Sequence, residues 1–183
     1  MQAPICVGFH ADFFYAERIE VAMFKKKDTR FLTRAAVIAA IYCALTLLLR
    51  PISYGEVQLR VSEALTLLPV LTPAAVPGLF IGCLLANLLG GSTVIDIVFG
   101  SLATLGAALV TRRLRNKPAL AALAPVLFNA VIIGLVLSGL SDMPLPLIML
   151  WIGLGEAAAC YALGLPLLYM LKRAKLDTRL FAD

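Results

Sequence analysis

Apolar segments of about 20 residues follow one another along most of this chain, separated by short polar or basic stretches. Such a segment is long enough for an α-helix to cross the hydrocarbon core of a bilayer. Hydrophobic residues make up 61% of the 183 residues, charged residues make up 15%, and the mean hydropathy is +0.94. Soluble domains contain about 45–50% apolar residues. The sequence therefore predicts an all-α integral membrane protein with no room for a second soluble domain.

We expect six spans in one bundle, at about residues 32–49, 61–71, 74–90, 93–110, 118–140 and 147–171. Of the 16 Lys and Arg residues, this topology leaves only Arg50 and Arg60 outside, as the positive-inside rule requires. If residues 61–90 formed a single kinked helix, five spans would place the basic residues of 112–117 and 172–175 outside. The six-span topology puts both termini in the cytoplasm.

The first 22 residues do not fit this membrane domain, because residues 1–22 mix aromatic, acidic and basic side chains without a period. Met23 is followed by Phe-Lys-Lys-Lys, a more usual start for a membrane protein. We therefore expect the native chain to begin at Met23 and the membrane domain to cover 23–183. An intact mass that includes Met1 or Gln2 would contradict this start.

Ionisable and amide side chains interrupt the apolar segments, and each would cost a few kcal/mol if it faced lipid. They are therefore predicted to face the protein interior or a water-filled cavity. Most lie near the external ends of their spans, and the cytoplasmic halves are almost wholly apolar, which predicts a ligand pocket open to the outside and closed below. Arg60 could alternatively form a structural ion pair with Glu63 or Asp96. The candidate ligand-binding residues are Arg60, Glu63, Asn87, Asp96, Asn129 and Glu156.

Two aromatic residues, Phe128 and Trp151, could offer a ring face on which a ligand stacks. Trp151 lies near the outer end of the last span, so it could equally be an ordinary anchor at the membrane interface.

Small residues recur every four positions in two of the predicted helices. Ala36, Ala40 and Ala44 form one such row in the first span, and Ala35 and Ala39 form a second row beside it. The third span carries Gly78, Gly82, Ala86 and Gly90 at the same spacing. Rows of small residues let helix backbones approach closely. The third span must therefore pack tightly on a neighbour, and the Ala36 row serves either packing within the bundle or docking of a partner.

Motifs of enzymes are absent from the sequence. It has no phosphate-binding glycine loop, no His-Glu-x-x-His and no Gly-x-Ser-x-Gly. The four cysteines show no paired spacing, and the single histidine, His10, has no ligand-spaced neighbour. We therefore expect no enzymatic activity, no metal and no cofactor. Energy for any uphill transport must then come from a partner subunit or from an ion gradient.

Several segments carry a family likeness. Three of them lie within 58–109: RVSEALTLLP, LTPAAVPGLFIGCLLANLLGG and DIVFGSLATLGAAL. A fourth, at 152–171, is IGLGEAAACYALGLPLLYML. Together these segments resemble the queuosine-precursor transporter family QueT. The similarity covers about residues 24–175. QueT proteins belong to the substrate-binding S components of energy-coupling factor (ECF) transporters.

The resemblance implies a six-helix S component of the bacterial cytoplasmic membrane. Such a subunit captures its ligand outside the cell and docks, through the Ala36, Ala40 and Ala44 row, on one transmembrane coupling subunit with two ATPase subunits, which use ATP. The implied ligand is a 7-deazaguanine precursor of queuosine, such as 7-aminomethyl-7-deazaguanine. Two alternatives are a proton-coupled secondary carrier that uses Asp96 or Glu156, and a structural membrane subunit.

The polar inventory suits that ligand, because carboxylates outnumber the one guanidinium. A carboxylate can accept both adjacent N–H donors of the deazaguanine edge, and an ammonium needs a second acidic partner. We expect Glu156 to bind the ring edge, Glu63 or Asp96 to bind the ammonium, and the amides of Asn87 and Asn129 to contact the ring carbonyl.

Overall fold

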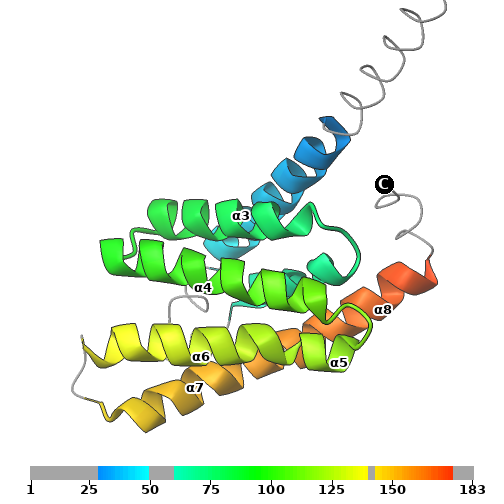
Figure 1. Ribbon diagram of the computed structural model, residues 1–183. Coiled ribbons are helices and arrows are strands. Elements are labelled where there is room, and N and C mark those ends of the chain that lie inside the picture. Colours follow the sequence, from blue (N-terminus) through cyan, green and yellow to red (C-terminus); the bar gives the residue numbers. More distant parts are fainter. Residues whose placement is uncertain (1–28, 50–59, 140–142, 175–183) are drawn as a thin grey trace, which may run out of the picture.

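The computed structural model describes residues 29–49, 60–139 and 143–174, so residues 1–22 and the expected start at Met23 lie outside the described residues. Every regular element in these ranges is a helix, which confirms the all-α class. The elements are helix Thr29–Leu48, η1 (Val61–Val70), α3 (Ala75–Gly90), α4 (Val94–Arg113), α5 (Pro118–Ala121), α6 (Leu123–Ser138), α7 (Leu145–Ala157), η2 (Ala158–Gly164) and α8 (Leu165–Arg173) (Figure 1).

Four helical stretches are long and apolar enough to cross a membrane: Thr29–Leu48, Val94–Arg113, Pro118–Ser138 and Leu145–Arg173. Two shorter apolar helices, η1 and α3, lie between the first and second of these. All six coincide closely with the predicted segments. Residues 61–90 do not form one kinked helix, because the chain turns over residues 71–74 between η1 and α3.

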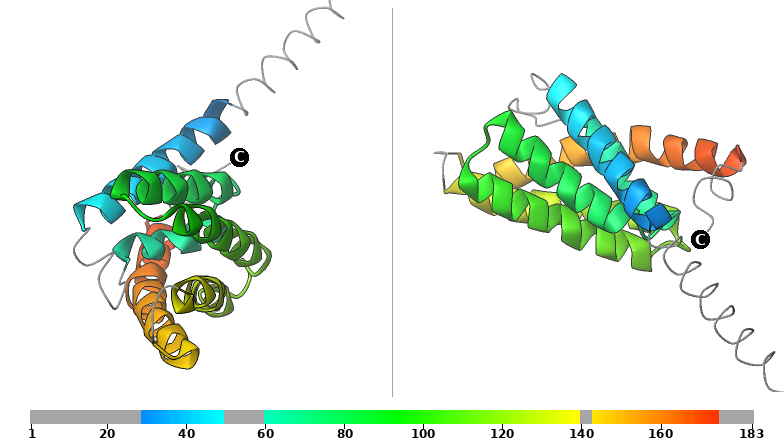
Figure 2. Two further views of the ribbon diagram at one scale, coloured as in Figure 1. Left: turned by 90° about the vertical axis from the view of Figure 1, so that its left-hand side faces the viewer. Right: turned by 90° about the horizontal axis from the view of Figure 1, so that it is seen from above.

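Helix Thr29–Leu48 packs on α3 through the small residues of both, and the two helices run in the same direction (Figure 2, right). A Cβ added at Gly78 would lie 2.7 Å from the carbonyl oxygen of Ala35, and one at Gly82 would lie 2.9 Å from that of Ala39. The predicted tight packing of the third span is thus confirmed. Its partner is the row of Ala35 and Ala39.

Replacing Gly78 with alanine is expected to lower the free energy of unfolding by about 1–3 kcal/mol, because the new methyl group meets backbone that cannot move cheaply. Thermal unfolding in detergent measures the effect. Gly153→Ala is the matched control, since a Cβ there would meet only the Ala130 methyl group at 3.6 Å. Equal unfolding temperatures for the two variants would contradict the close contact.

The 3-10 helix η1 lies among the longer helices and contacts η2, α4 and α3 (Figure 2, left). Nine of its ten residues are buried. Pro69 within it has no N–H to donate, which disfavours the α-helical hydrogen bond at this point. A 3-10 helix rises about 2.0 Å per residue, so ten residues span about 20 Å instead of the roughly 15 Å of an α-helix. The short segment therefore reaches further through the bundle.

The predicted fifth and sixth spans are confirmed as the helical stretches Pro118–Ser138 and Leu145–Arg173, and each contains one local irregularity. Between α5 and α6 the break falls just before Pro125, which cannot donate to the carbonyl oxygen of Ala121. That oxygen accepts a hydrogen bond from Thr111 Oγ1 at 3.3 Å instead. In the last span, the π-helical η2 separates α7 from α8, and Pro166 likewise has no N–H for the carbonyl of Ala162.

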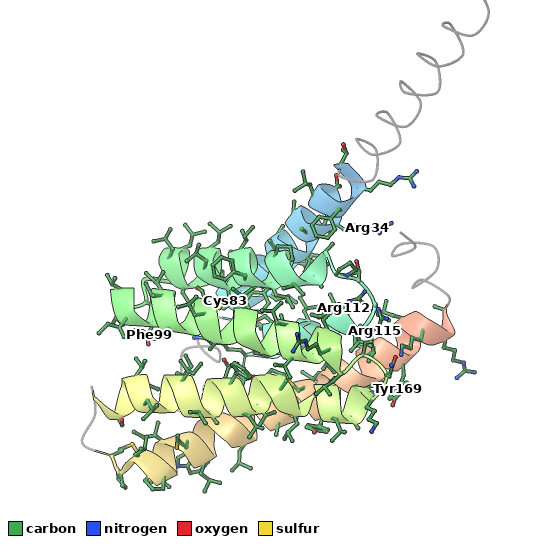
Figure 3. All side chains as sticks on the ribbon, in the orientation of Figure 1. Arg34, Cys83, Phe99, Arg112, Arg115 and Tyr169 are labelled. Atoms are coloured by element: carbon green, nitrogen blue, oxygen red, sulfur yellow. The ribbon has the colours of Figure 1, made fainter. Side chains whose placement is uncertain are left out.

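The ends of the helices agree with the predicted directions of the second and fourth spans. Arg112, in the last turn of α4, donates from Nη1 to the carbonyl oxygens of Pro69 at 3.0 Å and Val70 at 3.4 Å, at the end of η1. In Figure 3, Arg34, Arg112 and Arg115 lie toward one end of the molecule. At the end of α3, Gly91 adopts φ 74°, a left-handed conformation that suits glycine, and the chain turns there toward α4.

Candidate functional site

Four of the candidate residues are buried in the interior of the described bundle. Glu63 and Asn87 are each 1% exposed, and Asn129 and Glu156 are each 5% exposed. They belong to η1, α3, α6 and α7. For these four, the prediction that polar side chains within apolar segments face the interior is confirmed.

Glu63 lies in the first turn of η1, where helix Thr29–Leu48 covers it. The phenol of Tyr42, which is fully buried, donates a hydrogen bond to Oε1 of Glu63. One turn along the same helix, Thr46 Oγ1 donates to Ser62 Oγ at 2.7 Å. Two side chains of one helix face thus hold the start of η1.

Glu156 lies near the end of α7, just before the π-helical segment. Asn129 of α6 donates from Nδ2 to its Oε1 at 2.8 Å. The two helices run antiparallel at close range, because a Cβ at Gly134 would come within 2.7 Å of Met149 Cγ. This packing brings together the candidate polar residues of the predicted fifth and sixth spans.

Arg60 precedes η1 and is partly buried. It lies within electrostatic range of both Glu63 and Glu156, and the two carboxylates lie within electrostatic range of each other. The three ionisable side chains therefore lie in the same region of the bundle, although Glu156 is far from the other two in sequence.

Each of the two carboxylates is only half satisfied. Oε2 of Glu63 and Oε2 of Glu156 are buried and have no hydrogen-bond partner among the residues that the structure describes. A buried polar atom without a partner costs about 1–3 kcal/mol, and more if it is charged. Two acceptor atoms at one buried site are suited to a molecule that brings hydrogen-bond donors.

Asn87 lies at the edge of this cluster, between α3 and α4. Its Nδ2 is 3.5 Å from both Cys83 Sγ and the carbonyl oxygen of Asp96. Gly100 leaves room for it, since a Cβ there would lie 3.1 Å from Nδ2. Cys83, between the same two helices in Figure 3, also belongs to the core cluster of Tyr42. Asn87 is therefore connected, through Cys83, to the core cluster that contains Tyr42, the hydrogen-bond partner of Glu63.

Asp96 has a structural partner at the start of α4. Its Oδ2 accepts a hydrogen bond from Thr93 Oγ1 at 2.8 Å, and its backbone N–H donates to the same hydroxyl oxygen at 3.2 Å. This reciprocal arrangement caps the helix, and an acidic residue in the first turn also suits the helix dipole. Asp96 is only partly buried.

The two aromatic candidates lie on different surfaces. The Phe128 ring packs on α4 at Gly106, where an added Cβ would overlap with it. Trp151 is 44% exposed on α7. This exposure fits the alternative of an interface anchor better than that of a stacking face inside the site.

The two adjacent alanine rows of the first helix differ in burial. Ala35 and Ala39 are buried against α3, whereas Ala36, Ala40 and Ala44 are exposed. Within the described part of the chain, packing inside the bundle therefore involves the row of Ala35 and Ala39 and not the row of Ala36, Ala40 and Ala44.

Tyr42 is the site residue that sequence reasoning missed. A signal was available, because Tyr42 and Thr46 are four residues apart and so share one helix face within an apolar span. The described residues contain no group of three His, Cys, Asp or Glu side chains that could hold a metal ion.

Comparison with known proteins identifies the family to which this chain belongs. The family model described as QueT transporter matches residues 32–173. The chain is 37% identical over 83 residues to the "Queuosine precursor transporter QueT" of Lactococcus lactis subsp. cremoris (strain MG1363), an alignment that covers 44% of this chain and 48% of that protein. The chain thus spans about half the length of this curated relative. No solved structure matches it significantly. Since the family model covers most of the chain, this multi-pass membrane protein belongs to the QueT transporter family.

Proposed function

We propose that the chain is the substrate-binding S component of an ECF transporter, and that it takes up a queuosine precursor across the bacterial cytoplasmic membrane. One observation carries the proposal: in a QueT family protein, two buried carboxylates, Glu63 and Glu156, each keep one oxygen without a partner in the described bundle. The name of the Lactococcus relative supports the ligand class.

The proposed ligand is 7-aminomethyl-7-deazaguanine, which brings two kinds of donor. Glu156 binds the adjacent N–H groups of the ring edge, and Glu63 binds the ammonium. Glu63 is preferred to Asp96 for this role because Glu63 is buried and keeps one buried oxygen without a partner among the described residues, whereas Asp96 is only partly buried and caps α4. Asn129 lies beside Glu156, and Asn87 is buried between α3 and α4. We propose that the amides of these two residues contact the ring carbonyl.

In the proposed assembly the six apolar segments cross the membrane, and the exposed Ala36, Ala40 and Ala44 dock on the coupling subunit. Two ATPase subunits supply the energy from ATP, so the S component itself carries no catalytic site. The exposure of these three small side chains supports the docking role, because a flat surface lets a second helix approach closely.

Co-purification tests the function directly. Protein purified from cells grown in rich medium is expected to carry a 7-deazaguanine, identified by mass spectrometry. In liposomes the chain alone is expected to bind this molecule without transporting it, and transport is expected once the coupling and ATPase subunits are added. Ion-driven transport by the chain alone would favour the secondary carrier. Failure to bind any small molecule would favour the structural subunit.

A further inference from the structure

Glu63 and Glu156 share a pattern that points to how the site selects its ligand. Each carboxylate has Oε1 held by one neutral donor from a neighbouring helix, which is the Tyr42 phenol for Glu63 and the Asn129 amide for Glu156. In each case Oε2 is the atom that has no partner in the described part of the chain. The donors therefore determine which oxygen remains available.

Tyr42 is a restrictive donor. Its ring is fully buried among Cys83, Leu79 and other residues of the core between helix Thr29–Leu48 and α3, so the phenol cannot swing away. A phenol has a single O–H, which it gives to Oε1 of Glu63. The carboxylate is then held in one orientation instead of rotating between equivalent ones.

The chemistry of the free oxygen indicates what this orientation serves. Oε2 of Glu63 is buried and has no hydrogen-bond partner among the described residues, and the Tyr42 hydrogen bond to Oε1 fixes its direction. A carboxylate oxygen accepts hydrogen bonds, and an ammonium brings three donors and a positive charge. The ammonium of the ligand is therefore best placed on Oε2 of Glu63.

We infer that Tyr42 is a positioning residue that orients Oε2 of Glu63 toward the ligand ammonium, and that it thereby sets the preference for cationic over uncharged 7-deazaguanines. The inference rests on the proposed function. Tyr42 does not touch the ligand in this arrangement. Without its hydroxyl group, Glu63 can turn either oxygen toward Arg60, and the ammonium loses its oriented acceptor.

The test compares two ligands on the purified full chain by calorimetry: 7-aminomethyl-7-deazaguanine, which is cationic, and 7-cyano-7-deazaguanine, which is uncharged. Tyr42→Phe is expected to weaken binding of the cationic ligand by about tenfold to a hundredfold, the usual worth of a hydrogen bond to a charged group. Binding of the cyano compound is expected to change by less than about threefold. The selectivity ratio is the decisive readout, because a merely structural role would affect both ligands alike.

Thr46→Val is the matched control, since Thr46 lies on the same helix face but its hydroxyl bonds to Ser62 Oγ and to the backbone carbonyl oxygen of Tyr42, and not to a carboxylate. It is expected to leave the ratio unchanged. If Tyr42→Phe does not fold, Glu63→Gln takes its place and is expected to remove the same preference. An unchanged ratio in the variant tested, or a wild type that does not prefer the cationic ligand, overturns the inference. A wild type that binds neither compound contradicts the proposed function instead.

Discussion

Glu156→Gln is expected to weaken binding of 7-aminomethyl-7-deazaguanine by at least tenfold. Truncating a buried, hydrogen-bonded charge typically costs about 2–5 kcal/mol, or roughly 30-fold to several thousand-fold in affinity. The geometry explains why a glutamine cannot replace the acid. Its oxygen would accept from Asn129 in place of Oε1, and its NH₂ group would then face the ligand where Oε2 accepts donors.

Calorimetry on the purified chain measures this loss, with Asp96→Asn as the matched control. Asp96 is also a carboxylate on an apolar helix, but Thr93 occupies its Oδ2. The control is expected to lower stability by about 0.3–1 kcal/mol, because it removes a negative charge from the first turn of α4, and to change affinity little. Glu56→Gln, outside the described residues, is also expected to bind as the wild type does. If Glu156→Gln binds as tightly as the controls, Glu156 is a packing residue and the ligand assignment fails.

Ala40→Trp is expected to abolish assembly with the coupling subunit and to leave ligand binding by the isolated chain intact. Ala40 is exposed at the middle of its row, so a bulky indole there keeps a partner helix at a distance without disturbing the interior. Co-purification with a tagged coupling subunit measures assembly, and calorimetry measures binding.

Two control variants make this result specific. Ala39→Trp, one residue away, is expected to destabilise the chain itself, because Ala39 is buried against Gly82. Leu135→Trp on α6, where Leu135 is 53% exposed, places the same ring on another outer face and is expected to assemble normally. Assembly of Ala40→Trp at the wild-type level would remove the Ala36 row from the docking surface.

The sequence by itself determined the helical class and the positions of the elements. Helix Thr29–Leu48, α3 and α4 lie within a few residues of their predicted bounds, because apolar length and flanking basic residues constrain where a membrane helix starts and ends. It also identified Glu63, Asn87, Asn129 and Glu156 as buried. The reason is energetic, since such groups are costly anywhere else in a lipid-embedded chain.

Only the tertiary structure decided which way the remaining side chains face. These helices are apolar all round, so periodicity does not reveal their rotation about the axis. That rotation buries Ala35 and Ala39 while exposing Ala40, turns Trp151 outward and brings Tyr42 onto Glu63. The pairing of Asn129 with Glu156 likewise depends on how α6 and α7 pack. Contacts between residues far apart in the sequence depend on how the helices pack, and the packing of each helix depends on the side chains of all its neighbours.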